Sequence, residues 1–333
     1  MRMKKNNIKN FTFIDLFAGI GGIRTAFEKL GGECVFSSEW DKYCQQTYKE
    51  NFGEVPTGDI RKIDENDIPT HDILTGGFPC QAFSIAGKRG GFEDIRGTLF
   101  FEVARIIKHH SPKIVFLENV KGLMNHDKGR TLATIINVLR NELDYFVPEP
   151  QIINAKDFGV PQNRERIIIV GFRKDLGVTS FEYPKPKNIK VYIEDILEEK
   201  EVSPKYYLSD VYLNSLKAHK ERHASKGNGF GFEIKDLKDI ANAIVVGGMG
   251  RERNLIVDKR LTDFNPVTKI KGSINKEYIR RLTPREWARL QGFDDSFKIP
   301  VSDAQAYKQF GNSVAIPAIK AVAEKVLSYT ENK

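Results

Sequence analysis

Three side chains suited to covalent chemistry follow apolar runs of the chain. Cys80 stands behind a proline in 77-GFPCQ-81, Glu118 ends the apolar run that precedes it, and Arg166 closes 162-QNRER-166. A thiolate is a strong nucleophile, a carboxyl group can give or share a proton, and a guanidinium can hold an oxygen atom. The set predicts covalent attack by Cys80 on a bound substrate.

Each of these residues also has a structural alternative. Glu118 and Arg166 can form an ion pair that only stabilises the fold, although both flank the sheet edge expected to carry the thiol. The other two cysteines, Cys34 in a predicted strand and Cys44 in a predicted helix, are expected to be packed core thiols. Pro79 stiffens the approach to Cys80.

The elements around these residues alternate between strands and helices. Helical spacing of apolar residues predicts helices over 98–110 and 130–144. The predicted strands are 12-TFIDLF-17, 34-CVFSSE-39, 72-DILTGG-77, 114-IVFLEN-119 and 166-RIIIVGF-172. This order predicts an α/β fold with a doubly wound, mostly parallel, Rossmann-like sheet that binds ligands at the carboxyl ends of its strands.

A composition change after 184-PKPK-187 predicts a second, smaller and irregular domain. Its short apolar runs include 243-AIVV-246 and 254-NLIVD-258. The tail 313–330 is an amphipathic helix expected to pack back on the first domain. We therefore predict a catalytic and cofactor-binding domain from 1–187 with 305–333, and a target-recognition domain from 188–304.

The turn 15-DLFAGIGG-22 follows the first strand and precedes a helix that begins near Ile23. Glycine lets a backbone pass close to a ligand, although tight packing of strand on helix is the alternative explanation. A dinucleotide fingerprint built on Gly19 and Gly21 requires a third glycine at position 24, where Arg24 stands.

Three further residues indicate which nucleoside-containing ligand this turn binds. Glu39 ends the second strand about 20 positions after Gly19, where a carboxylate can accept from ribose hydroxyls. Trp40 offers a ring face to an adenine, and Asp59 can accept from the adenine amino group; a helix N-cap or turn is the alternative for Asp59. Ribose and adenine contacts without a pyrophosphate cradle favour S-adenosylmethionine over NAD.

Composition bounds the partners and the compartment. Among 333 residues, 52 Lys and Arg against 44 Asp and Glu give a net charge of +8, which favours a polyanionic partner, with solubility as the alternative. The three cysteines fit neither a disulfide framework nor a metal site. No apolar span reaches membrane or signal-peptide length, so a soluble, cytoplasmic protein is expected.

Methylation of cytosine at carbon 5 needs this set of groups. Carbon 5 is a poor nucleophile until a thiolate adds to carbon 6 and makes it enamine-like. A carboxyl group on ring N3 and an arginine on the exocyclic oxygen then stabilise the charge and hold the ring. The base that removes the carbon-5 proton is not identified by the sequence.

Over nearly its whole length the chain resembles the DNA cytosine-5 methyltransferase family. The matching motifs, in order, are 17-FAGIGG-22, Glu39-Trp40, 58-GDI-60, 77-GFPCQ-81, 118-ENV-120, 162-QNRER-166, 281-RLTPREWARLQGF-293 and 311-GNSV-314. The resemblance implies that Cys80 is the nucleophile, with Glu118 on N3, Arg166 on the cytosine oxygen, and Arg164 and Gln162 nearby.

The same resemblance implies a cofactor site for S-adenosylmethionine. Its expected residues are Phe17, Gly19, Gly21, Gly22, Glu39, Trp40, Asp59, Ile60, Pro79, Leu99, Asn312, Ser313 and Val314.

Two regions are expected to meet duplex DNA. The segment 81–97 resembles the family's mobile loop, which traps a base rotated out of the helix, with an ordinary exposed basic loop as the alternative. The stretches 226–232 and 246–255 resemble recognition segments of bacterial enzymes that modify the inner cytosine of CCGG. Arg251 and Arg253 can read guanine or hold phosphates. The candidate DNA-binding residues are Gln81, Ser84, Lys88, Arg89, Arg96, Asn228, Phe230, Arg251 and Arg253.

The prediction is a monomeric restriction-modification methyltransferase without a metal, paired with a restriction endonuclease. One alternative is a transfer-RNA cytosine-5 methyltransferase, which the long variable region after residue 185 disfavours. Another is a catalytically silent DNA-binding regulator, disfavoured by Cys80 and Glu118. An NAD-linked oxidoreductase is disfavoured by Arg24. In the motif 281–293, Trp287 and Leu290 are expected to be core residues.

Overall fold

The computed structural model describes residues 10–79, 99–187, 189–229, 231–247, 250–265 and 272–330. They form two compact units. The first spans Met1–Asn154, Glu165–Pro186 and Ile316–Lys333, and the second spans Ala155–Arg164 and Lys187–Ala315. Relative to the boundaries expected from the sequence, 155–164 and 305–315 group with the second unit.

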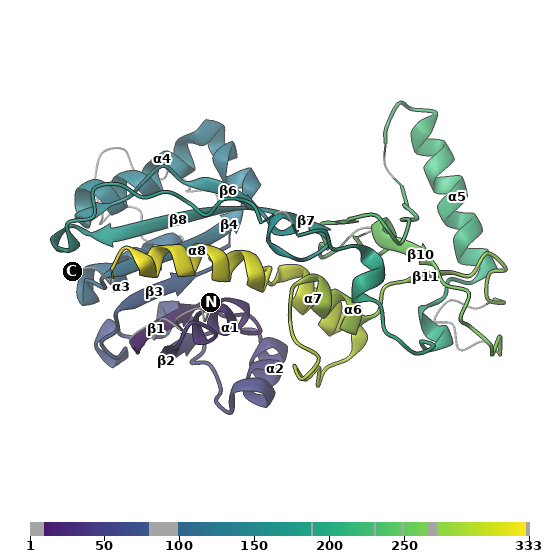
Figure 1. Cartoon of the computed structure of the whole chain (residues 1–333), viewed down its shortest axis with the longest axis horizontal. Coiled ribbons are helices and arrows are strands. Elements are labelled where there is room, and N and C mark those ends of the chain that lie inside the picture. The colour runs from purple at the N-terminus through teal and green to yellow at the C-terminus, as the bar shows by residue number, and fades with distance from the viewer. Residues whose placement is uncertain are drawn as a thin grey trace, which may run out of the picture. The chain divides into compact units, whose positions relative to one another are not determined.

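The first unit is built on a seven-stranded sheet (Figure 1). Its strand order is β2-β1-β3-β4-β8-β5, and β6 also pairs with β8. The strands are β1 (Phe11–Leu16), β2 (Gly32–Ser38), β3 (Ile73–Gly76), β4 (Ile114–Val120), β5 (Tyr145–Phe146), β6 (Gln151–Asn154) and β8 (Glu165–Arg173). All five strands predicted from the sequence are present, within one or two residues of their expected bounds.

The expectation of a mostly parallel sheet is wrong for one half of it. The strands β2, β1, β3 and β4 pair in parallel, whereas β8 runs antiparallel to β4, β5 and β6. For β6 and β8 the ten-residue connection accounts for this, because a parallel pair needs a crossover of a dozen residues or more. The sequence pattern also missed the short strands β5 and β6.

Helices cover both faces of the sheet, which confirms the doubly wound architecture. They are α1 (Gly22–Glu28), α2 (Lys42–Phe52), α3 (Leu99–His110), α4 (Arg130–Asn137) and α8 (Ile316–Ser328). One face carries a core with α3 and α4 that includes Leu74, Val115 and Ile167. On the other face the Phe27 ring of α1 contacts Phe13 and Phe116.

The predicted helices of this unit are confirmed. The helix predicted over 98–110 is α3, which spans 99–110, and the helix predicted over 130–144 is α4 followed by a π-helical turn over Val138–Glu142. The tail helix α8, yellow in Figure 1, packs against α1, so both ends of the chain build this unit.

The second unit contains three longer helices and two small sheets. Its helices are α5 (Asp210–Ala224), α6 (Pro284–Leu290) and α7 (Asp303–Asn312), and its strands are β7 (Gln162–Asn163), β9 (Ala241–Asn242), β10 (Leu255–Val257) and β11 (Ile279–Arg281). Of the two short apolar runs noted in the sequence, 254–258 contains β10, and 243–246 forms no strand. The sequence missed α5 because only Leu213 and Leu216 of this helix are buried, which leaves little helical periodicity.

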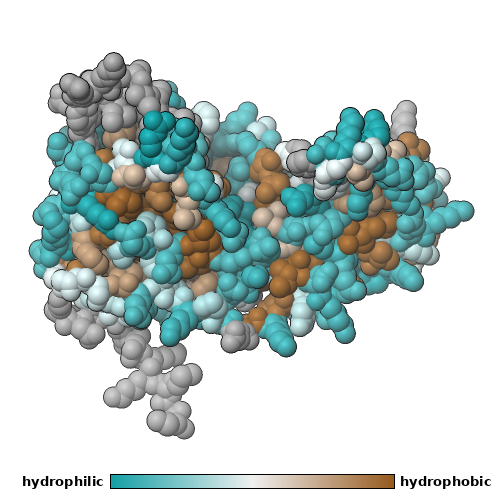
Figure 2. All heavy atoms as spheres, turned by 90° about the horizontal axis from the view of Figure 1, so that it is seen from above, coloured by the Kyte–Doolittle hydropathy of each residue, from teal (hydrophilic) through white to brown (hydrophobic). Residues whose placement is uncertain are grey.

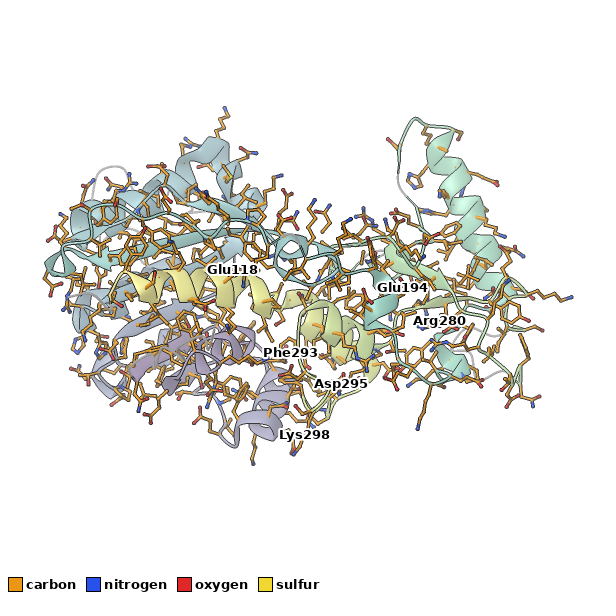
Figure 3. The ribbon with its side chains drawn as sticks, in the orientation of Figure 1. Glu118, Glu194, Arg280, Phe293, Asp295 and Lys298 are labelled. Carbon is orange, nitrogen blue, oxygen red and sulfur yellow. The ribbon has the colours of Figure 1, made fainter. Side chains whose placement is uncertain are left out.

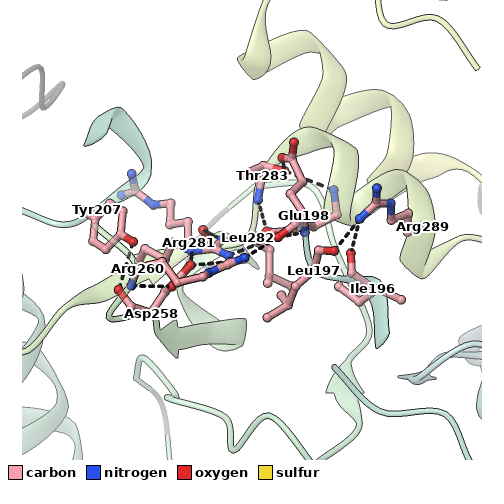
Figure 4. A network of polar contacts seen from close by, with 12 residues as sticks. Ile196, Leu197, Glu198, Tyr207, Asp258, Arg260, Arg281, Leu282, Thr283 and Arg289 are labelled. Carbon is pink, nitrogen blue, oxygen red and sulfur yellow. Dashed lines mark hydrogen bonds and ion pairs between the residues drawn. The ribbon is translucent and has the colours of Figure 1, made fainter. Parts of the chain in front are cut away.

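Buried charges organise the second unit around α6. Thr283 caps this helix in a capping box with Glu286, and Pro284 follows at its first turn. The fully buried guanidinium of Arg280, labelled in Figure 3, donates to both carboxylate oxygens of Glu286, at 2.7 and 2.8 Å, and to Asp258 at 2.7 Å. Figure 4 shows Asp258 and Thr283 within the surrounding network of polar contacts.

Trp287 and Leu290 are buried, which confirms the core role predicted for them.

On the face seen in Figure 2, hydrophilic residues predominate and hydrophobic residues show only in patches between them. Within the described ranges, no helix combines the length and the apolar character that a membrane crossing requires.

Candidate active site

The turn between β1 and α1 has the geometry of a ligand-binding loop. Phe17, Gly19 and Gly21 all have positive φ, at 56°, 57° and 81°. A Cβ added at Gly19 would meet nothing within 4 Å, whereas one at Gly21 would lie 2.3 Å from the Phe52 ring. Gly19 therefore leaves room for a ligand, and Gly21 serves the packing of α1 on α2.

Glu39 ties this turn to the end of β2. Its carboxylate accepts from the backbone N–H of Gly19 at 2.9 Å and from that of Asp41 at 2.7 Å. Burial raises the pKa of the Glu39 carboxyl. Next to it, the Trp40 side chain is 75 % exposed. An open backbone, an acceptor and a free aromatic face fit a nucleoside group, as S-adenosylmethionine carries.

Asp59 has the N-cap geometry considered as its alternative. It caps the 3-10 turn Ile60–Lys62 by accepting from the backbone of Arg61 at 3.1 Å. Its side chain also pairs with the Arg61 guanidinium, and this contact lowers the pKa of the Asp59 carboxyl. Ile60 is buried beneath the turn.

Glu118 and Arg166 meet across β4 and β8. Arg166 Nε lies 2.9 Å from Glu118 Oε1, and Arg166 also donates to the carbonyl of Glu165 at 2.8 Å. The Glu118 residue is 8 % exposed (Figure 3). A Cβ added at Gly77 would lie 3.4 Å from Glu118 Oε2, so this glycine leaves space beside the carboxylate.

A side chain of β4 also holds the backbone at Phe78, two residues before Cys80. Asn119 is buried, and its Nδ2 donates to the carbonyl of Phe78 at 2.8 Å. Its Oδ1 accepts from the backbone of Val120 at 2.8 Å. Pro79 is the last described residue before Cys80, and Leu99 begins α3. Sequence reasoning missed Asn119, although it stands inside the motif 118-ENV-120.

Several predicted residues lie outside the described residues. They are Cys80, Gln81, Ser84, Lys88, Arg89, Arg96 and Phe230.

Gln162 and Arg164 belong to the second unit and have the contacts of a scaffold. Arg164, 1 % exposed, donates to the carbonyls of Ile244 at 2.8 Å and Gly311 at 3.0 Å, and also to that of Ser313. Gln162 accepts from the backbone of Ile244 at 3.0 Å and donates to the carbonyl of Leu290 at 2.9 Å.

Together the two side chains hold both polar groups of Ile244. These contacts are those of positioning residues, and the catalytic role expected from the sequence stays a prediction.

The remaining predicted residues also lie in the second unit. Asn312 ends α7, Ser313 caps it by donating its N–H to the Gln309 carbonyl at 3.0 Å, and the Val314 side chain is buried. Asn228 follows α5.

Arg251 and Arg253 are exposed on the 3-10 turn Gly250–Asn254. The Arg251 guanidinium lies 5.6 Å from the centre of the Tyr307 ring.

Asp15 is a second residue that sequence reasoning did not single out, although it opens the motif 15-DLFAGIGG-22. It is fully buried in β1, and its Oδ1 accepts from the Thr75 hydroxyl at 3.1 Å. Its other oxygen has no hydrogen-bond partner among the described residues. Burial raises the pKa of the Asp15 carboxyl to about 7.

No group of three or more His, Cys, Asp or Glu side chains within the described ranges could hold a metal ion.

The doubly wound fold and the glycine turn closed by Glu39 fit an α/β enzyme that binds a nucleoside-containing cofactor, the class to which S-adenosylmethionine-dependent methyltransferases belong. The chain belongs to the family of C-5 cytosine-specific DNA methylases, whose model matches residues 11–328. It is therefore a DNA cytosine-5 methyltransferase that uses S-adenosylmethionine as methyl donor.

Curated relatives match almost the whole chain. It is 67% identical over 327 residues to the type II methyltransferase M.HpaII of Haemophilus parainfluenzae, covering 97% of this chain and 91% of the relative. It is 49% identical to the type II methyltransferase M.DsaV of Dactylococcopsis salina, covering 99% and 88%. The crystal structure of the S. pombe Dnmt2 methyltransferase shares the fold, with a TM-score of 0.71 at 17% identity, over 98% of this chain and 100% of that one.

Proposed function

We propose that this enzyme methylates the inner cytosine of CCGG in duplex DNA and thereby protects host DNA from a partner restriction endonuclease. The likeness of 226–232 and 246–255 to recognition segments of CCGG-modifying enzymes supports the target. The identity with type II methyltransferases across the whole chain supports the restriction-modification role. One chain supplies both units, which supports action as a monomer, and we propose the cytoplasm as its location.

The pair Glu118–Arg166, held beside the segment that leads to Cys80, carries the proposed mechanism. Asn119 fixes the Phe78 carbonyl, two residues before the thiol, from the strand that also carries Glu118. The backbone at Phe78, which leads toward the proposed nucleophile, is thus held by the strand that carries the Glu118 carboxyl group, and covalent attack on a ring requires such a fixed arrangement.

In the proposed reaction the Cys80 thiolate forms a bond to carbon 6 of a base turned out of the duplex. Glu118 gives a proton or a hydrogen bond to ring N3, and Arg166 holds the exocyclic oxygen, so negative charge does not accumulate on the ring. S-adenosylmethionine, held by Gly19, Glu39 and Trp40, would supply an electrophilic sulfonium methyl group to carbon 5, with its S–CH3 bond breaking and neutral S-adenosylhomocysteine leaving. Loss of the carbon-5 proton and elimination of the thiolate restore the aromatic ring and the enzyme.

The cofactor site is proposed at the turn after β1. Gly19 supplies the open backbone, Glu39 accepts from the ribose and Trp40 stacks on the adenine. The other residues proposed around the cofactor are Phe17, Gly21, Gly22, Asp59, Ile60, Pro79, Leu99, Asn312, Ser313 and Val314. Both oxygens of Asp59 accept from Arg61, so its proposed role at the adenine requires the guanidinium contact to open.

The DNA contacts are proposed from sequence and charge. Ser84, Lys88, Arg89 and Arg96 would bind phosphates, and Arg251 and Arg253 would read base edges. We propose Gln81, Asn228 and Phe230 as further contacts.

Bisulfite sequencing of a random-sequence plasmid after incubation with the protein and S-adenosylmethionine tests the proposal. Protection confined to the inner cytosine of CCGG is the expected result. Protection at another short motif would overturn the target but keep the reaction. A parallel incubation with transfer RNA is the control, and methylation of RNA without methylation of the plasmid would overturn the proposed substrate.

A further inference from the structure

The 3-10 turn Gly250–Asn254, which carries the two proposed reading arginines, alternates between buried and exposed residues. Glu252 is 2 % exposed and Asn254 is 1 % exposed, while Arg251 and Arg253 are exposed. Two polar side chains thus point into the protein and two cations point out of it. Polar groups are buried in this way only when partners satisfy them.

The partners of Glu252 come from two other elements. Its Oε1 accepts from Arg281 at 2.8 Å through Nη2 and at 3.0 Å through Nε, and from the Tyr212 hydroxyl at 3.1 Å. The Arg281 guanidinium also lies 5.1 Å from the centre of the Tyr212 ring. The carboxylate thereby joins the turn to β11 through Arg281 and to α5 through Tyr212.

Asn254 is held as firmly from β9. Its Oδ1 accepts from the backbone N–H of Asn242 at 2.7 Å, and its Nδ2 donates to the carbonyl of the same residue at 3.1 Å. In return, the Asn242 side chain donates to the carbonyl of Arg253 at 2.9 Å. The backbone of Arg253 is therefore fixed on both sides, by the anchors at 252 and 254.

The first residue of the turn, Gly250, has no space for a side chain. A Cβ added at Gly250 would lie 2.3 Å from the carbonyl oxygen of Val245, so only glycine fits this approach. The Glu252 carbonyl accepts from the backbone of Glu233 at 2.9 Å. These backbone contacts and the side-chain contacts of Glu252 and Asn254 fix the backbone of the turn. They therefore determine the direction in which the Arg251 and Arg253 side chains leave it.

We propose that Glu252 is a positioning residue for target recognition: its buried pairing with Arg281 and Tyr212 fixes the direction in which Arg251 and Arg253 leave the backbone. This inference rests on the proposed reading of DNA by these arginines. A guanidinium discriminates a guanine only when both of its hydrogen bonds are aligned, whereas a loosely held arginine adapts to a phosphate or to another base. Loss of the anchor should therefore reduce discrimination more than affinity.

The test compares substitutions of two buried carboxylates, each of which pairs with one of two adjacent arginines of β11. Glu252→Gln removes the charge that faces Arg281, and Asp258→Asn, the matched control, removes the charge that faces Arg280. Glu252→Ala removes the anchor altogether. For each variant, kcat/KM is measured on the preferred duplex and on duplexes with one base pair changed, together with the unfolding midpoint and the Kd for S-adenosylmethionine.

The expected result is a loss of discrimination specific to position 252. Glu252→Ala should lower the ratio of the two kcat/KM values by about tenfold, which corresponds to one weakened bidentate contact. Glu252→Gln should lower it less, since an amide oxygen still accepts. Asp258→Asn should leave the ratio of the two kcat/KM values unchanged, even if it lowers the unfolding midpoint as much as the Glu252 variants do.

Four outcomes separate the possible failures. An unchanged ratio in Glu252→Ala overturns the inference, and so does an equal fall of the ratio in Asp258→Asn, because either result makes Glu252 merely structural. A ratio that survives the double change of Arg251 and Arg253 to Ala overturns the reading role on which the inference rests. The absence of wild-type methylation on any duplex would instead overturn the proposed substrate.

Discussion

At the scale of single residues, the proposed site separates groups assigned to the chemistry from groups that hold the backbone. Glu118 and Arg166 pair at 2.9 Å within the sheet unit. A catalytic pair and a structural ion pair predict different kinetics for the Glu118 variant. Asn119, next to Glu118 on β4, holds the Phe78 carbonyl.

Glu118→Gln should slow single-turnover methyl transfer by about 100-fold or more, because an amide cannot give a proton to ring N3. The Kd for duplex DNA should change little. Cys80→Ser serves as the reference: it should abolish transfer and keep cofactor binding. If Glu118→Gln weakened only DNA binding, Glu118 would be a structural residue.

Asp15 should make stability depend on pH. Burial raises the pKa of its carboxyl from 3.8 to about 7, so between these values the folded protein holds a proton that the unfolded chain releases. The contribution of this group is therefore largest at acid pH and is lost as the pH rises through 7, at about 1.4 kcal/mol per pH unit inside this window.

Urea unfolding of wild type and Asp15→Asn from pH 5 to pH 8 measures this effect. Asparagine keeps an acceptor for Thr75 but has no proton to lose. The free energy of unfolding of the wild type should fall relative to that of the variant as the pH rises. Parallel profiles would show that Asp15 does not titrate in this range.

At the scale of elements, the turn between β1 and α1 assigns different tasks to its glycines. The Phe52 ring of α2 occupies the space beside Gly21 and lies 4.4 Å from the Arg24 guanidinium. Arg24 also donates to Glu28 at 2.6 Å and to Tyr48 at 3.0 Å. Position 24 therefore holds α1 against α2, which accounts for the missing third glycine.

Gly19→Ala and Gly21→Ala should fail in different ways. Both place a side chain at positive φ, which costs about 1 kcal/mol. Gly21→Ala adds a clash with Phe52 and should mainly lower the unfolding midpoint. Gly19→Ala should mainly weaken cofactor binding, by about tenfold, because its methyl group enters open space. Calorimetry of binding and unfolding decides, and equal effects in both assays would contradict the assignment.

At the scale of the whole molecule, residues from both ends of the sequence build the sheet unit. The helix α8 packs on α1, and its residues Val322, Ala323 and Val326 are completely buried. The second unit has its own core around Leu213, Leu255 and Ile279. We therefore expect the sheet unit to need α8 for its stability, because α8 covers α1 near the other end of the chain.

Val322→Asp should destabilise the protein by about 3 kcal/mol or more, because it buries a charge without a partner. Glu324→Gln on the exposed side of α8 is the control and should change the free energy of unfolding by less than about 0.5 kcal/mol. Chemical unfolding gives both values, and a small effect of Val322→Asp would show that α8 is dispensable for the sheet unit.

The sequence alone determined the order of the main elements of the sheet unit and the family of the chain, and it proposed the reacting groups. Apolar periodicity located β1, β2, β3, β4 and β8 and the helices α3, α4 and α8, because burial on one face is written into local spacing. The ordered motifs identified the family, and the glycines at 19 and 21 marked the cofactor turn.

Only the tertiary structure decided which groups meet. The antiparallel pairing of β8, the closure of Arg166 on Glu118 and the grip of Gln162 and Arg164 on Ile244 join residues far apart in the chain. The helix α5 was not predicted from the sequence because only Leu213 and Leu216 of this helix are buried, which is too few for a periodic apolar pattern. Local propensity follows from short-range sterics and solvation, whereas long-range partners are set by complementarity that no short window of sequence contains.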